Sequence, residues 1–117
     1  MKLITAISMS LVSLSAVANS CDDVVRVDSV DNVIYVVCPS LPSMNKEDLA
    51  QATYKIIIQK NFNTDVGFII NFIYSKKELD RVGLTSKNHL GEYFSDSNNF
   101  ILWPKDKSKR NEVQLRI

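Results

Sequence analysis

The sequence predicts an α+β domain, an antiparallel sheet of about five to six strands with one main helix packed on one face. Several short segments alternate apolar and polar residues with the period of two that a half-buried strand shows. One longer segment, residues 46–60, instead carries its apolar residues at helical spacing. The strand-like segments are joined mostly by short turn-forming sequences, which favours hairpins over long crossovers.

The first two strands are predicted to form a hairpin. Residues 24–30 alternate apolar and polar side chains, and residues 33–37 form a second strand-like run. Asp31 and Asn32 lie between them, and both residue types tolerate the left-handed backbone angles of a tight turn.

The main helix is predicted to begin at Lys46. Asn45 and Asp48 are spaced as in a capping box, in which a polar side chain satisfies the free N–H groups of the first turn. The β-branched run 56–58 is also compatible with a strand, but the cap and the alanine-rich turn before it favour a helix. Turn-forming residues at 61–65 end the helix.

The most apolar segment after the N-terminal leader is residues 66–74. Apolar side chains occur on both of its faces, which is typical of a central strand. Ser75 and Glu78 then form a second capping box, so a short helix is expected over residues 76–82. Residues 84–90 are interpreted as a loop.

The C-terminal part is predicted to hold three strands. Residues 91–95 and 100–103 are strand-like and are separated by a polar turn at 96–99. A charged loop at 105–111 follows, and residues 112–117 alternate again as a last strand.

The N-terminus is typical of a cleavable signal peptide. Lys2 is followed by an apolar or small stretch, 3–17, and the small-x-small pattern required for cleavage ends at Ala18. The stretch is shorter than the ~20 apolar residues that span a bilayer. We therefore expect a signal peptide at 1–18, a single α+β domain at 19–117 with no transmembrane segment, and a bacterial periplasmic or secreted location.

The two cysteines, Cys21 and Cys38, are predicted to form a disulfide in that oxidising compartment. It would close the open end of the first hairpin. An alternative stays open, because Ser20 and Cys21 also resemble the start of a lipoprotein, in which Cys21 carries acyl chains and anchors the protein to a membrane. The two states exclude each other, since an acylated Cys21 cannot pair with Cys38.

The composition excludes several classes of protein. Without Lys2 the chain has 13 basic and 13 acidic residues, so its net charge is zero. A nucleic-acid-binding domain would carry a strongly basic surface. With one histidine and no Cys-x-x-Cys spacing, the chain lacks the ligands of a zinc site, and no cofactor motif is present.

The strongest candidate for catalysis is His89, which a hydrolase would use as a general base. Glu92 lies three residues away, and Ser86 and Ser95 are the nearest hydroxyls. None of them forms a nucleophile motif. We expect a loop histidine that is solvent-facing or hydrogen-bonded locally, and no catalytic residue is assigned.

Aromatic and basic residues gather late in the chain, where they form the candidate partner-binding surface. Because neighbouring residues of a strand point to opposite faces, either Tyr93 or Phe94 is expected to be exposed. An exposed aromatic residue next to a basic loop is a common anchor in protein interfaces. The alternative is that the loop is a solvated hairpin connection with no binding role. The candidate residues are Tyr93, Trp103, Lys105, Lys107, Lys109 and Arg110.

The sequence therefore predicts a non-enzymatic binding or inhibitory domain whose partner is another protein. In size, leader and cysteine pair it resembles small exported inhibitor, immunity and lipoprotein families, and no motif selects one of them. The alternatives are a structural or accessory component of a cell-envelope or secretion complex, a lipoprotein anchored through Cys21, and a small hydrolase using His89.

Overall fold

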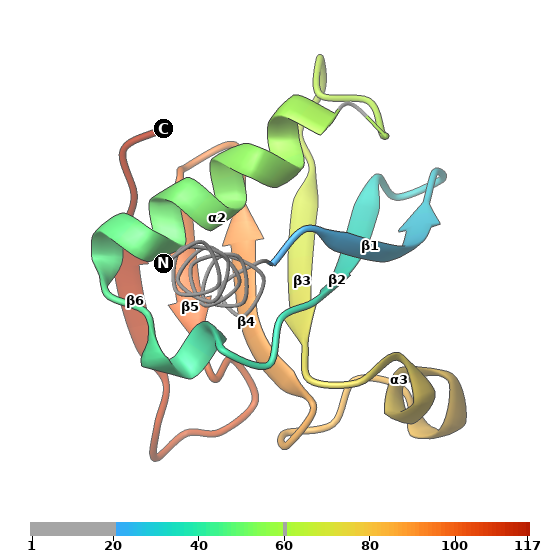
Figure 1. Ribbon diagram of the computed structural model, residues 1–117, viewed down its shortest axis with the longest axis vertical. Coiled ribbons are helices and arrows are strands. Elements are labelled where there is room, and N and C mark those ends of the chain that lie inside the picture. The colour runs from blue at the N-terminus through green and yellow to red at the C-terminus, as the bar shows by residue number, and fades with distance from the viewer. Residues whose placement is uncertain (1–20, 60) are drawn as a thin grey trace, which may run out of the picture.

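The computed structural model describes residues 21–59 and 61–117, and the predicted signal peptide, residues 1–18, lies outside them. The described chain forms a six-stranded mixed sheet in the order β1-β2-β3-β4-β5-β6. Two α-helices and one short 3-10 helix complete it (Figure 1). The bounds are β1 (Asp23–Asp28), β2 (Val33–Val37), η1 (Leu41–Ser43), α2 (Lys46–Gln59), β3 (Ile69–Ile73), α3 (Lys76–Val82), β4 (His89–Phe94), β5 (Asn99–Leu102) and β6 (Asn111–Gln114).

The α+β class is confirmed, but the prediction of an antiparallel sheet is wrong for one strand pair. β2 and β3 run parallel, and every other neighbouring pair is antiparallel. The reason is α2, which lies between these two strands in the chain and crosses one face of the sheet (Figure 1). Its 14 residues extend about 21 Å, which returns the chain to the end where β2 began.

The main core lies between α2 and the sheet. Asn45 caps the helix as predicted, because its Oδ1 accepts the N–H of Asp48 at 2.8 Å. Leu49 and Ile56 are buried on the inner side of the helix. They belong to one apolar cluster with sheet residues that include Ile34, Val36, Ile70, Phe72, Tyr93 and Phe100.

The short helix expected over residues 76–82 is present as α3, and it contacts the side of the sheet away from α2, so the prediction of one main helix on one face is only partly confirmed. Arg26 pairs across the β1–β2 ladder with Tyr35, and its guanidinium lies 5.4 Å from the Tyr35 ring centroid. Tyr35 alternates with the core residue Ile34 and therefore belongs to the face away from α2. From this face Arg26 donates to Asp80 of α3 at 2.5 Å, and Leu79 of the same helix is buried.

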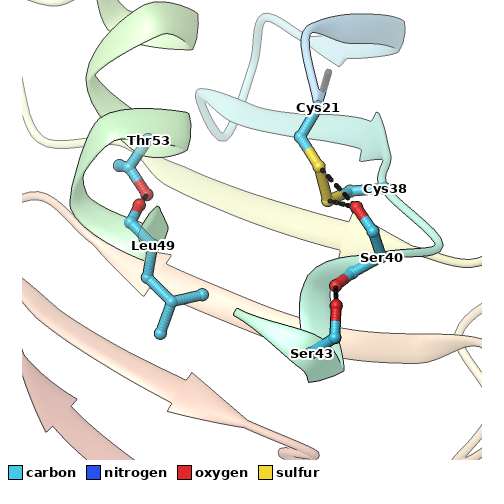
Figure 2. The surroundings of a disulfide bond; sticks show 6 residues. All are labelled: Cys21, Cys38, Ser40, Ser43, Leu49 and Thr53. Atoms are coloured by element: carbon cyan, nitrogen blue, oxygen red, sulfur yellow. Dashed lines mark hydrogen bonds between the residues drawn. A yellow bond between two sulfur atoms is a disulfide. The ribbon is translucent and has the colours of Figure 1, made fainter. Parts of the chain in front are cut away.

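The predicted disulfide between Cys21 and Cys38 is present (Figure 2). It joins the residues next to the start of β1 and the end of β2, which closes the open end of the hairpin as expected. The two residues are 3 % and 0 % exposed. The Ser40 hydroxyl lies 3.6 Å from the sulfur of Cys21, and the η1 turn beyond it is held by a bond from Ser43 Oγ to the Ser40 carbonyl at 2.7 Å. The disulfide is thus a buried structural crosslink.

Among the described residues, no helix combines the length and the apolar character needed to cross a membrane.

Candidate functional site

Two basic segments lie at one end of the sheet. β3 ends where β4 begins, and β5 ends where β6 begins, so segments 74–88 and 103–110 both emerge at the same end (Figure 1). Together they contain eight basic residues against three acidic ones. We call these two segments the basic end. Its cations are Lys76, Lys77, Arg81, Lys87, Lys105, Lys107, Lys109 and Arg110.

The other end of the sheet carries acidic residues. The described segments 28–32, 61–68 and 95–98 all lie there, because Val33, Ile69 and Phe94 pair across neighbouring strands at that end. They contain four aspartates, which are Asp28, Asp31, Asp65 and Asp96. The connecting segments at the two ends of the sheet therefore differ in charge, although Asp22 and Asp23 at the start of β1 also lie at the basic end, and such a difference steers a charged partner.

Trp103 opens the second basic segment in an unusual backbone conformation. Its φ is +52°, in the left-handed region that bulky residues rarely adopt. Its N–H donates to the Leu90 carbonyl at 2.9 Å, and its side chain packs against the edge of the core. The ammonium of Lys109 lies 4.7 Å from the Trp103 ring centroid, a distance typical of a cation–π contact. Strained residues of this kind concentrate at functional sites.

Asp106 fixes the shape of the loop that follows. Its N–H donates to the Trp103 carbonyl at 3.0 Å, and its own carbonyl accepts the Arg110 N–H at 2.8 Å. The Ser108 hydroxyl donates to the Asp106 carboxylate at 2.7 Å, and this hydrogen bond lowers the pKa of Asp106. Lys105 and Lys107 are exposed. The loop is therefore ordered by its own bonds while it presents cations to solvent.

Tyr93 is not available at this surface. It is 2 % exposed and lies among the core side chains under α2, 6.3 Å from Phe68 between ring centroids. Its hydroxyl donates to Asn98 Oδ1, and burial raises the pKa of the phenol. Phe94 on the opposite face is half-buried. Of the two aromatics named as contacts from the sequence, only Trp103 remains near the basic loop.

His89 is buried and its hydrogen-bond partner lies on another strand, which contradicts the expectation of a loop histidine that is solvent-facing or hydrogen-bonded locally. It is the first residue of β4 and is 2 % exposed. Its Nε2 lies 2.8 Å from Asn71 Oδ1, so Nε2 carries the proton, and Nδ1 has no hydrogen-bond partner within the described ranges. Burial and then the charge of Lys105 lower the pKa of His89 to about 4. The backbone of Gly91 raises the pKa of His89 by a smaller amount, although it forms no hydrogen bond with Nδ1 of the ring.

The groups that a hydrolase would use are not assembled around His89. Glu92 pairs across the β3–β4 ladder with Asn71, on the same face, and burial raises the pKa of its carboxyl group. Ser95 lies at the far end of β4, where its hydroxyl accepts the Phe68 N–H at 2.8 Å. Within residues 21–59 and 61–117 no cluster of histidine, cysteine and acidic side chains is arranged to hold a metal ion.

From the sequence, Lys76 and Lys77 extend the basic loop only if the fold brings them together, and Arg81 and Lys87 are missed. The topology places all four at the same end of the sheet as the 103–110 loop. The sequence signal was their abundance in one short stretch.

No protein-family model matches the chain, and neither curated proteins nor solved structures gave a match.

Proposed function

We propose that this protein is a small exported, non-enzymatic binding or inhibitory domain whose basic end recognises an acidic surface on another protein. The observation that carries the proposal is the convergence of segments 74–88 and 103–110 at one end of the sheet. Sequence order separates these cations, and the strand order brings both segments to the same end of the sheet.

The aromatic residue within this surface supports a protein partner rather than a simple counter-ion. Trp103 is partly exposed, and its ring is already covered on one side by Lys109. Tryptophan with neighbouring cations is enriched among the residues that dominate binding energy. Because Asp106 already orders the loop, binding would cost little conformational entropy.

A structural role in a cell-envelope complex is the second candidate, and the charge separation favours it specifically. An acidic end and a basic end on one molecule are complementary, so copies could associate head to tail. The lipoprotein alternative receives less support, because the sulfur of Cys21 is bonded to Cys38.

The test is affinity capture from periplasmic extract with crosslinking. The binding variants are Trp103→Ala and the charge reversal Lys107→Glu/Lys109→Glu. The matched control, Lys46→Glu/Lys55→Glu, introduces the same charge change on α2, where both lysines are exposed. Tyr93 is left intact, because its replacement would open the core.

We expect one acidic protein to be captured by the wild type and by the α2 control, and lost with both binding variants. Capture should also weaken as salt rises, since surface charges are screened. Equal loss with the α2 control would contradict the proposed surface. A mass that grows with protein concentration and falls with salt would instead support head-to-tail assembly.

A further inference from the structure

A hollow of about 480 Å³ lies between α3 and the segment that follows it. Its volume is within the range of about 300–1,000 Å³ that small-molecule sites commonly have. It lies apart from the loop 103–110, since every residue that lines it belongs to segment 74–88. Its lining has an apolar part and a charged part, which indicate an apolar body and a charged group on the ligand.

The apolar part consists of two side chains that would normally be covered. Tyr74 is 59 % exposed and Val82 is 46 % exposed, and both line the hollow. Tyr74 follows the last residue of β3 directly and Val82 ends α3, so they approach from two different elements. Exposed large apolar side chains that converge on a concave surface are a common sign of a binding site.

The charged part has an excess of one cation. Arg81 donates to the Glu78 carboxylate at 2.8 Å, so these two lining residues neutralise each other. Lys87 also lines the hollow, and it forms no ion pair with any residue in the described parts of the chain. Lys77 of α3 does not line the hollow, and it likewise forms no ion pair with the described residues. An anion therefore meets a favourable potential at this site.

The hollow is preformed because Asn88 fastens its two walls together. This side chain is 3 % exposed, and its Oδ1 accepts the Ser75 N–H at 2.9 Å while its Nδ2 donates to the Ser75 carbonyl at 3.2 Å. The Asn88 carbonyl also accepts the Tyr74 N–H at 3.0 Å. These bonds fix the start of α3 against the start of β4. A ligand would thus enter a site that needs little ordering.

We propose that this hollow binds a small amphipathic anion, in which an aromatic or aliphatic body carries a carboxylate or sulfonate group. The body packs against Tyr74 and Val82, and the anionic group pairs with Lys87. The hollow lies on segment 74–88 of the basic end, but the inference does not rest on the protein partner proposed above, because its test uses the isolated protein and a small probe.

The test uses the fluorescent anion 8-anilinonaphthalene-1-sulfonate as the probe, on the folded, disulfide-bonded protein. We expect saturable binding with one site. Decanoate should displace the probe, whereas decyltrimethylammonium, which has the same chain and the opposite charge, should not. Thermal unfolding and near-ultraviolet circular dichroism establish that each variant is folded, since a loosened core also binds this probe.

The variants are Tyr74→Ser for the apolar contact and Lys87→Gln for the charge. Each should weaken binding about tenfold, which corresponds to about 1.4 kcal/mol. The matched controls lie on α2: Tyr54→Ser removes a tyrosine that is 53 % exposed, and Lys55→Gln removes an exposed cation. Both controls should bind the probe as the wild type does.

Three results would overturn the proposal. The first is equal weakening by Tyr54→Ser, which would make the binding nonspecific. The second is equal displacement by the cationic chain. The third is the loss of probe binding when anionic vesicles are added, or when the protein forms a dimer that Tyr74→Ser abolishes, because the apolar surface would then be covered by a bilayer or by a second copy.

Discussion

Removing the disulfide should destabilise the protein by an amount that the structure allows us to divide into two parts. Cys21 and Cys38 are 17 positions apart in the chain. The loop-entropy model gives about 3 kcal/mol for a crosslink of this span, because it restricts the unfolded chain. Both residues are buried, so replacing them with alanine also leaves a small cavity, which adds about 1–2 kcal/mol.

Urea unfolding, followed by circular dichroism, measures both parts. Protein that is refolded under reductant keeps its sulfur atoms and should lose only the first part, lowering the midpoint by about 1–3 M. The variant Cys21→Ala/Cys38→Ala should lose both parts. The intact mass of the oxidised protein should rise by two hydrogen atoms on reduction. A reduced protein with an unchanged midpoint, or a mass that includes acyl chains on Cys21, would refute the reasoning.

Three further predictions concern buried residues of β4 and of the turn before it. Because the lowered pKa of His89 makes the unfolded chain bind more protons between about pH 6.5 and 4, stability should fall by up to about 3 kcal/mol as the pH falls through that window. Urea midpoints measured as a function of pH should lose this slope in His89→Gln. The slope should be steeper in Glu92→Gln, because the raised pKa of Glu92 changes stability with pH in the opposite direction. A slope retained in His89→Gln would contradict this assignment. Gly91→Ala should cost about 1–3 kcal/mol in thermal unfolding, because the added methyl group would lie 2.6 Å from a core leucine, whereas Gly67→Ala meets only a surface carboxylate and should cost less. Asn88→Ala should cost about 1–3 kcal/mol in urea unfolding, since it leaves buried backbone groups of the α3 junction without partners, and an unchanged midpoint would show that the junction does not contribute to stability.

Local chemistry explains why the helix bounds were predictable. The start of α2 at Lys46 and both bounds of α3 agree with the expectations from their caps, because a cap acts within four residues. Ser75 does accept the Glu78 N–H, at 3.3 Å. The other half of the expected capping box is wrong, since Glu78 turns to Arg81 and the Ser75 N–H is satisfied by Asn88. A partner 13 residues away leaves no local signal.

The burial of His89 could not be predicted for a related reason. Its neighbours in the chain are polar, which is typical of a loop. Its actual surroundings come from Asn71 on β3 and from the charged loop that holds Lys105. The candidate surface was predicted in the same incomplete way. The cations of the 105–110 loop could be recognised in the sequence, but only the topology shows that segment 74–88 lies at the same end of the sheet. The alternation of side chains along β4 places Tyr93 in the core under α2.

The parallel pairing of β2 and β3 has a direct consequence for the distribution of charge. Had α2 been followed by an antiparallel β3, the turn between β1 and β2 would lie at the same end as segments 74–88 and 103–110. Asp28 and Asp31 would then sit beside the cations and neutralise part of them. The crossover instead places this turn next to Asp65 and Asp96, so that these four aspartates lie at one end and the two basic segments at the other. The same helix that completes the core thus polarises the molecule, and the proposed recognition of an acidic partner depends on that one choice of strand direction.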